Sequence, residues 1–489
     1  MKSPLDPVTP EMVLQQRVWS ANFGNFVFSD SAHKMLMTER QELSLISDVN
    51  IARDKPEDIA ARVNESCDAV VLPFANALRG NYESTLRKWT EVVRRLRVPV
   101  TVLGIGAQST LEYETEPLRP LDDTVRTFCA AVLDRSPSIG VRGEFTQRYL
   151  AGLGFSDVEV IGCPSMFRYG NRLEVERKTP ALTCDSLIAA SYTDTQVGDM
   201  TRIFQANYDR YPRLHFIAQD LRELEIMYFG DTSEAAGIRS DRPRYRSHPA
   251  FTEDRVRLFL DPVTWINTLG EYDFSFGTRI HGTITSLLGG TPSVVLCHDS
   301  RTRELSEYFA IPHRRLCDLA PDTDAAELYE EADWRGLVDG HQERFERMTG
   351  FLVRHGLDHV YTETGGQGAA FEKRMADTDF APPVRTSPDT AGELGFRTAW
   401  LYANTKAVKQ RQAAATMRIA TLEQHVADLR DTARRLSADL EATRNLLATA
   451  QRSRIRQLML GGASRWRGGC HAARRKRAPW RAPGWWRRG

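Results

Sequence analysis

Short apolar runs alternate with helical patterns along residues 40–375, and this alternation is the strongest constraint on the fold. Runs of a few mostly apolar residues, separated by helices, are typical of parallel strands that are buried on both faces. The runs are ELSLIS, DAVVLPF, PVTVLGIGAQ, SIGVRG, VEVIGCPS, DSLIAASY, RLHFIAQ, VRLFLD, YDFSFGT and PSVVLCH. Helices are expected between them near residues 55–65, 82–95, 121–134, 144–153, 196–209 and 221–229.

The alternation stops at a polar stretch, residues 168–182, and then starts again. A chain of 489 residues is too long for one ordinary core. We therefore predict an α/β protein with two Rossmann-like domains in series, each built on a parallel sheet. The predicted divisions are 1–170 and 171–380 for the domains, 381–400 for a linker, 401–456 for a coiled coil and 457–489 for a basic tail.

The coiled coil is predicted from a heptad repeat. From Leu422 to Leu447 the apolar positions alternate in steps of four and three residues, with charged residues between them. The seam consists of Ile419, Leu422, Val426, Leu429, Ala433, Leu436, Leu440, Thr443 and Leu447. This pattern favours a homo-oligomer joined through the helix. The alternative is a helix that packs on its own domain, but the stripe is narrow and polar positions surround it.

The last 39 residues contain twelve Lys and Arg and no acidic residue, whereas the preceding 450 carry a net charge of −11. Arg with Trp suits contact with an anionic membrane surface. Phosphates of a nucleic acid would also suit these cations, although nucleic acid is not the expected partner. A third interpretation is a disordered tail that binds nonspecifically.

Seven scattered cysteines without a C-x-x-C pair indicate reduced thiols, and argue against a disulfide framework or a zinc site. The N-terminus lacks the apolar segment of a signal peptide, and no run approaches the roughly 20 apolar residues of a membrane span. We therefore expect a cytoplasmic protein, peripheral at the inner face of the membrane if the tail docks there.

The segment FGTRIHGTITSLLGGTP places a cation and an imidazole between an expected strand and an expected helix. Unpaired N–H groups and the helix dipole favour an anion at such a junction. The guanidinium of Arg279 can bind a carboxylate or phosphate through two hydrogen bonds, and His281 can transfer a proton near neutral pH. Gly282 lets a ligand approach the backbone closely. The alternative is that Arg279 pairs with a neighbouring carboxylate and His281 is buried in a helix contact.

Two further segments place polar residues after expected strands. Arg142 lies in the run SIGVRG, directly after the expected strand, where it is either a second anion anchor facing the cleft or a member of a surface salt bridge. His298 ends the run PSVVLCH, beside Asp299 and Arg301, and is a second candidate acid or base. The Gly-x-Gly of LGIGAQ does not complete a dinucleotide fingerprint, but it can bring backbone N–H groups to a ligand.

The segments NFGN, LGIGAQ, VRGEFTQRYLAGLG, IGCPSMF and GTRIHGTITSLLGGTPSVVLCHDSRTRELSEYF resemble the polysaccharide pyruvyl transferase family over residues 18–315. The resemblance implies two domains facing across a cleft, as in GT-B glycosyltransferases. It also implies transfer of a pyruvyl group from phosphoenolpyruvate to sugar hydroxyls, which forms a ketal on a surface polysaccharide or its precursor. No metal or other cofactor is implied, and the saccharide acceptor could be lipid-linked.

The resemblance implies catalytic roles for His281, Arg279 and His298, with either histidine as the acid that protonates the donor. The residues implied in substrate binding are Arg142, Asn22, Gly24, Asn25, Gly106, Gly282, Thr283 and Arg301. The chain departs from the family where Asn25 and Gly143 replace the usual Asp, and where Arg301 replaces the usual Lys. Two alternatives stay open, a GT-B-type glycosyltransferase with a nucleotide-sugar donor and a catalytically silent interaction protein.

Overall fold

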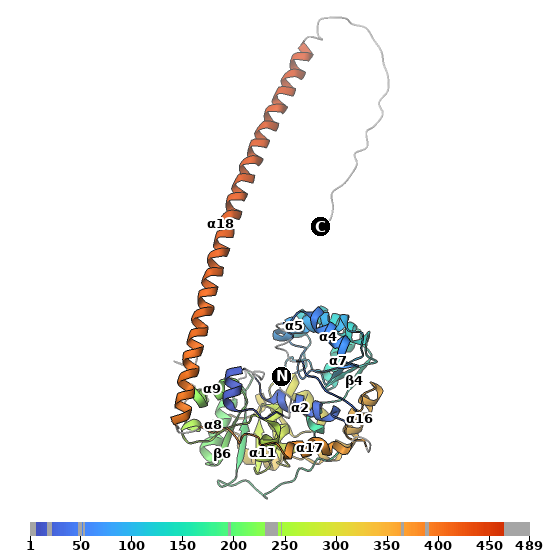
Figure 1. Ribbon diagram of the computed structural model, residues 1–489, viewed down its shortest axis with the longest axis vertical. Coiled ribbons are helices and arrows are strands. Elements are labelled where there is room, and N and C mark those ends of the chain that lie inside the picture. Colours follow the sequence, from blue (N-terminus) through green and yellow to red (C-terminus); the bar gives the residue numbers. More distant parts are fainter. Residues whose placement is uncertain are drawn as a thin grey trace. The chain divides into compact units, whose positions relative to one another are not determined.

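The computed structural model describes residues 6–16, 22–46, 51, 54–193, 197–229, 243–245, 247–362, 366–386 and 391–463 (Figure 1). The chain forms two compact units, Met1–Arg397 and Thr398–Gly489. All the described strands lie in the first unit and pair in parallel, which confirms the α/β class. The predicted domain boundary near residue 170 lies inside this unit and stays a prediction.

The first half of the unit contains four short strands, β1 (Val70–Pro73), β2 (Val100–Leu103), β3 (Ile139–Val141) and β4 (Val158–Val160). Strand β1 pairs with β2, and β3 pairs with β4. A parallel bridge between Ile105 and Val141 joins the two pairs. The order β1-β2-β3-β4 places the loops after β2 and β3 next to each other, and these loops contain Gly106 and Arg142.

The second half contains a six-stranded parallel sheet in the order β10-β9-β8-β5-β6-β7. Read from β7, this is the doubly wound order 3-2-1-4-5-6, whose crossovers reverse direction between β5 and β8. The strands are β5 (Ile188–Ser191), β6 (Leu214–Ala218), β7 (Val256–Leu258), β8 (Phe274–Gly277), β9 (Ser293–Cys297) and β10 (His313–Arg315).

Helices connect the strands, and all six of those predicted lie at the expected places. In the first half they are α4 (Pro56–Ser66), α5 (Glu83–Arg95), α6 (Asp122–Leu133) and α7 (Glu144–Gly152). The second half contains α8 (Met200–Arg210), α9 (Leu221–Phe229), α10 (Pro249–Thr252), α11 (Pro262–Leu269), α12 (Ile280–Leu288), α13 (Ser300–Phe309), α14 (Ala325–Glu331), α15 (Arg335–Asp339), α16 (His341–Arg354) and α17 (Ala369–Ala376). Single 3-10 turns are η1 (Gly80–Tyr82), η2 (Glu116–Leu121), η3 (Pro164–Phe167), η4 (Leu316–Asp318) and η5 (Gly366–Gly368).

The two helices at the N-terminus, α1 (Pro10–Gln16) and α2 (Gly24–Leu36), place their buried apolar residues mainly in the core of the second half, although α2 also contacts β1. Helix α2 is buried along most of its length and contacts α11 and α12 of the second half (Figure 1). Its apolar residues belong to the core of the six-stranded sheet, whereas residues 51–158 form a separate core. The N-terminus of α2 therefore lies beside the N-terminus of α12.

One expectation about local structure needs correction. The run ELSLIS was expected to be a strand, but residues 41–46 form none, and Leu45 is 40% exposed; without a neighbouring strand, the backbone has no ladder to join. Helix α18 (Ala391–Ala463) begins inside the expected linker 381–400. Its 73 residues cover the segment expected to form the coiled coil, while pairing with another chain stays a prediction. Residues 464–489 of the basic tail lie outside the described residues.

The six cysteines that the structure describes are all free thiols. A helix long and apolar enough to cross the bilayer is not found among the described residues.

Candidate active site

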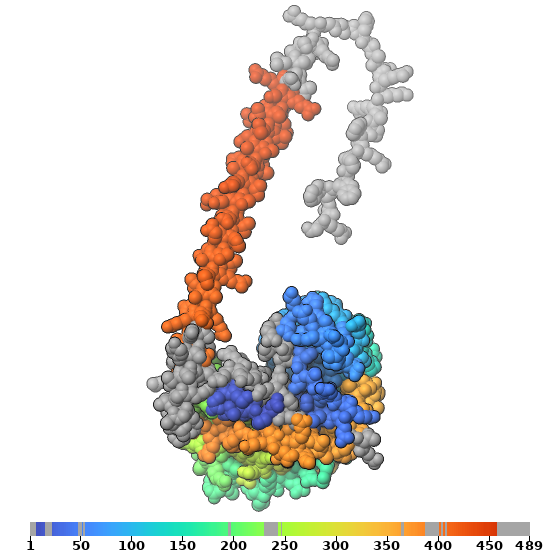
Figure 2. All heavy atoms as spheres, viewed as in Figure 1, coloured from blue at the N-terminus to red at the C-terminus, as the bar shows by residue number. Residues whose placement is uncertain are grey.

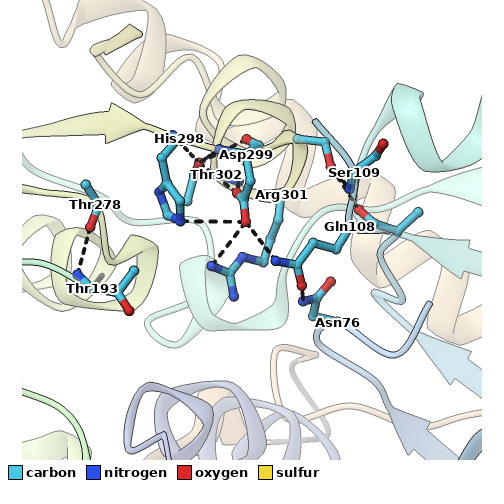
Figure 3. Close-up of polar contacts among 11 residues, drawn as sticks. Asn76, Gln108, Ser109, Thr193, Thr278, His298, Asp299, Arg301 and Thr302 are labelled. Atoms are coloured by element: carbon cyan, nitrogen blue, oxygen red, sulfur yellow. Dashed lines mark hydrogen bonds and ion pairs between the residues drawn. The ribbon is translucent and has the colours of Figure 1, made fainter. Parts of the chain in front are cut away.

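The site lies where the order of the six-stranded sheet reverses, at the carboxyl ends of β5 and β8. Ligands of open α/β sheets bind at this position. Gly277 ends β8 with φ +149°, and a Cβ there would lie 1.7 Å from the backbone oxygen of Ser191. Only glycine lets β8 pass β5 so closely. The backbone N–H of Thr193 donates to the Thr278 hydroxyl at 3.0 Å and fixes the turn that leads into α12 (Figure 3).

Arg279 lies directly before α12 and binds a carboxylate. Its guanidinium donates to Asp220 and, at 3.4 Å, to the backbone oxygen of Tyr192. Glu223 supports Asp220 because its carboxylate accepts from the backbone N–H groups of Gln219 and Asp220 at 2.6 and 2.9 Å. Arg279 therefore forms the ion pair with a neighbouring carboxylate that the sequence left open as the alternative to an anion-binding role. Its guanidinium is oriented by Asp220, at the edge of the site.

His281 lies in the first turn of α12 and is 8% exposed. A Cβ on Gly24 would lie 2.9 Å from the Cβ of His281, so the close approach of α2 requires glycine. Burial, and then the charges of Arg142 and Arg301, lower the pKa of His281 to about 3. The imidazole is therefore neutral at pH 7 in the free protein. Its Nε2 atom is buried and has no hydrogen-bond partner among the described residues.

Arg142 comes from the other half of the unit, directly after β3, and is 1% exposed. Burial lowers its pKa, and the charges of Cys163 and Glu304 raise it, although among the described residues no carboxylate lies within ion-pair distance of its guanidinium. The surface salt bridge considered for Arg142 is thus wrong, because this side chain is buried. Gly106 makes room for it, since a Cβ at position 106 would lie 2.2 Å from Nε of Arg142. A buried cation that has no carboxylate within ion-pair distance is costly to the fold and suits an anionic ligand.

Changing Gly106 to alanine should displace Arg142. The new methyl group would overlap the Arg142 side chain, which is buried and has little room to move. We expect kcat/KM to fall by about 10²-fold, and the melting temperature to fall as well, because overpacking a buried site costs about 1–3 kcal/mol. Gly152→Ala is the matched control, because a Cβ there meets nothing within 4 Å. Equal activity of the two variants would show that the position of Arg142 does not matter.

A third group of polar residues surrounds the carboxylate of Asp299 (Figure 3). Its Oδ2 lies 3.7 Å from Nε2 of His298 and 3.4 Å from Nη2 of Arg301. Gln108, from the loop after β2, donates to the same oxygen at 3.1 Å and accepts from Asn76 at 2.8 Å. Asp299 also caps α13 by accepting from the backbone N–H of Thr302 at 2.9 Å. One carboxylate thus orients a histidine, an arginine and the loop of the first half.

His298 is the second histidine of the site. Burial lowers its pKa, Asp299 raises it, and Arg301 and Arg279 lower it further. Its Nδ1 is buried and is left without a partner among the described residues. The Asp299 carboxylate near Nε2 favours the protonated form of the His298 ring and orients its Nδ1 atom. Histidine–carboxylate pairs of this kind perform acid–base catalysis.

Glu304 was missed in the sequence, although it lies beside the departure at Gly143. A Cβ on Gly143 would lie 2.3 Å from Cγ of Glu304, so the glutamate from α13 occupies the space beside this glycine. Its carboxylate accepts from the backbone N–H and hydroxyl of Thr146 at 2.6 and 3.0 Å. The two halves of the unit thereby meet next to Arg142. The sequence held one signal for this carboxylate. Gly143 replaces the Asp that the family usually has after Val-Arg, so a carboxylate from another part of the chain could have been expected there.

Burial raises the pKa of Glu304 to about 7, against 4.5 for a free glutamate. Because the pKa of Glu304 is higher in the folded than in the unfolded protein, the fold favours the protonated carboxyl group. The resulting stability is fully present below pH 4.5 and is lost as the pH rises through 7. Glu304→Gln, which cannot ionise, should therefore be more stable than the native protein at pH 8 by about 1–3 kcal/mol. The advantage should vanish at pH 5. Denaturant unfolding at both values measures it, with the exposed Glu327→Gln as control.

The remaining predicted residues line the same junction. A Cβ on Gly282 would lie 2.5 Å from the hydroxyl of Ser191 and 2.6 Å from the amide of Gln219. Thr283 is fully buried. Asn22 pairs with Asp220 through an antiparallel bridge and accepts from the backbone N–H of Gly24 at 2.9 Å. Asn25 is half-buried in the first turn of α2. The structure therefore brings all the predicted site residues to one junction between the two halves.

Buried polar atoms without partners gather at this junction. Native proteins leave few such atoms, so a cluster indicates a place where a polar ligand or water binds. Among the described residues they are Ser191 Oγ, Gln219 Nε2, His281 Nε2, Thr283 Oγ1, His298 Nδ1, Arg142 Nε and Arg301 Nε. Most of these atoms are hydrogen-bond donors, which fits an anion.

A cavity of about 750 Å³ lies at the opposite end of α12. Its walls include Lys34, Tyr169 and Gly289, and none of the predicted site residues. Lys34 is paired with Glu372 there. The two histidines and Arg142, near the N-terminus of α12, mark the candidate site better than this volume does.

The family model described as polysaccharide pyruvyl transferase matches residues 15–300. No curated protein matches the chain. Similar solved structures include a UDP-bound MnaA from S. aureus, with 15% identity, 70% of this chain and 83% of that chain covered, and a TM-score of 0.34. UDP-GlcNAc 2-epimerase from Neisseria meningitidis has 10% identity, coverage of 69% and 84%, and a TM-score of 0.32.

The glycosyltransferase SnogD from Streptomyces nogalater has 12% identity, coverage of 67% and 84%, and a TM-score of 0.28. TM-scores in this range do not establish a common fold. The architecture described above rests on the strand order of this chain.

Proposed function

Because the chain belongs to the polysaccharide pyruvyl transferase family, an enzyme family, we propose that it transfers a pyruvyl group from phosphoenolpyruvate to two hydroxyls of a sugar. The product is a ketal on a surface polysaccharide or its precursor. The observation that carries this proposal is the buried Arg142, which has no carboxylate within ion-pair distance, next to the unpaired nitrogens of His281 and Arg301. A donor with both a carboxylate and a phosphate would satisfy these groups. The two α/β halves meeting at the site suit a GT-B-like arrangement.

The reaction adds two hydroxyls to one carbon of the donor. A proton adds to the methylene carbon, positive charge develops on the neighbouring carbon, and the first hydroxyl oxygen bonds to that carbon. Phosphate leaves with the electron pair of its C–O bond, and the second hydroxyl oxygen takes its place. One hydroxyl proton restores the enzyme acid, and the other leaves on the phosphate.

We assign the anions of the donor to Arg142 and Arg301, with Arg279 held at the edge by Asp220. His281, neutral because its pKa is about 3, would donate a hydrogen bond from Nε2 to the donor. His298 would deliver the proton to the methylene carbon, with Asp299 favouring its charged form. Preorganised cations at the site would stabilise the developing charge on phosphate.

Incubation with phosphoenolpyruvate and a panel of glycosides tests the function. We expect phosphate release together with a gain on the glycoside equal to the mass of a pyruvyl ketal. Thermal shifts should show stabilisation by phosphoenolpyruvate. Stabilisation by nucleotide sugars alone would favour the glycosyltransferase alternative and contradict the proposal.

The basic Trp/Arg tail suggests a cytoplasmic enzyme that contacts the inner face of the membrane. A chain ending at Ala463 keeps α18 and removes nine of the Lys and Arg residues. We expect it to lose sedimentation with anionic vesicles and to keep its turnover on a soluble acceptor. Vesicles of neutral lipid are the control. Equal sedimentation of the shortened and full chains would rule out this role for residues 464–489.

A further inference from the structure

The apolar seam of α18 forms a stripe that is exposed in the part of the chain that the structure describes. The large apolar residues of the seam are 46–69% exposed. Figure 2 shows the side chains of this helix projecting on all sides. The exposed members are Ile419, Leu422, Val426, Leu429, Leu436, Leu440 and Leu447. With about 1.5 Å per residue, the stripe is about 43 Å long. So long a row of exposed leucines indicates a binding surface.

We propose that this stripe binds the same stripe of a second copy, in a parallel, in-register, two-stranded coiled coil. The residues of the seam themselves indicate which partner covers the stripe. Leu422, Leu429 and Leu436 occupy d positions, and the β-branched Ile419 and Val426 occupy the first two a positions. The later positions of the seam are Ala433, Leu440 and Leu447 at a and Thr443 at d. Among parallel coiled coils, leucine at d with β-branched residues at a favours two strands, so the first half of the seam supports a pair.

Charges beside the seam specify direction and register. In a parallel, in-register pair, a g residue faces the e residue five positions later on the other helix. This rule pairs Arg418 with Glu423 of the second copy, and Asp439 with Arg444 of the second copy. The twofold symmetry repeats each pair. Within the described residues none of these four side chains forms an ion pair in its own chain, so all are available.

No like charges oppose each other at the g and e positions between 418 and 444 while histidine is neutral. His425 faces Arg430 of the second copy, and Thr432 faces Ser437. The charge pattern therefore complements the apolar seam in one orientation. The resulting dimer joins two copies of the catalytic unit.

The mass of the full chain in solution tests the pairing. Light scattering and sedimentation at micromolar concentration should give twice the mass of one chain. Replacing Leu429 and Leu436 with Asp buries four charges in the seam and should weaken association by at least about 100-fold. Because both leucines are exposed within one chain, the melting of unit 1–397 should not change. The control is Met417→Asp with Ala438→Asp, on the opposite face of the helix.

A monomeric native chain, a trimer, or a leucine variant that stays dimeric would overturn the proposal. Direction is tested separately by charge exchange. Glu423→Arg alone should weaken the dimer by at least about 10-fold at low salt, and Arg418→Glu in the same chain should restore it.

A disulfide provides a second test of direction. Ala450→Cys lies at a d position, so a parallel, in-register dimer brings the two thiols together. In a Cys470→Ser background, oxidation should join position 450 to position 450. Failure of both the charge exchange and the cross-link would refute the parallel register.

Discussion

Replacing Arg142 with methionine is expected to abolish turnover and to raise the melting temperature of the ligand-free protein. Methionine fills the space of the arginine stem beside Gly106 but carries no charge. The donor anion loses a pair of charge-assisted hydrogen bonds, so kcat/KM should fall by about 10³-fold. The fold, in contrast, no longer buries a cation that has no carboxylate within ion-pair distance. The free energy of unfolding should rise by about 1 kcal/mol.

Steady-state kinetics and thermal denaturation without ligand measure the two effects. Arg148→Met is the control, because Arg148 is exposed on the neighbouring helix α7. Arg142→Lys should recover only part of the activity, since an ammonium group cannot form the bidentate contact. Turnover within about threefold of the native rate in Arg142→Met would refute the anion clamp.

Replacing His298 with glutamine is expected to lower kcat by about 10²–10⁴-fold and to leave the KM for phosphoenolpyruvate nearly unchanged. Glutamine keeps hydrogen-bonding groups but cannot deliver a proton at neutral pH. His281→Gln should have the opposite profile, a higher KM with a smaller loss in kcat, because His281 is neutral and binds the donor. If His281→Gln has the larger effect on kcat, the roles of the two histidines must be exchanged.

The carboxylate beside His298 gives this assignment a pH signature. Asp299 raises the pKa of His298, so Asp299→Asn should lower it. An acid with a lower pKa loses its proton at lower pH, and the alkaline fall of kcat should therefore begin at lower pH. Asparagine is also a good helix cap, which preserves the start of α13. An alkaline limb that does not move would exclude His298 as the acid.

Much of the local structure could be predicted because hydrophobic periodicity is local. The strands that end at Gly277 and Cys297, and the helices after them, follow from short apolar runs. The strand predicted at residues 42–46 is absent because a strand also needs a neighbouring strand for its hydrogen bonds, and a local pattern does not supply one. Helix α2 was missed because its sequence is apolar on most sides and punctuated by glycine, and burial in the second core stabilises it.

The α/β class, the heptad repeat and the junction of strand, Arg279, His281 and helix can be read from the sequence, because each depends on patterns of residues close together in the chain. Which distant groups meet at that junction depends on the three-dimensional arrangement. It placed Arg142 and Arg301 near His281, bound Arg279 to Asp220, and filled the space beside Gly143 with Glu304. Strand order and the contact between two cores bring together residues that are 59 positions apart for Asp220 and Arg279 and 158 apart for Thr146 and Glu304, and local periodicity does not encode that order.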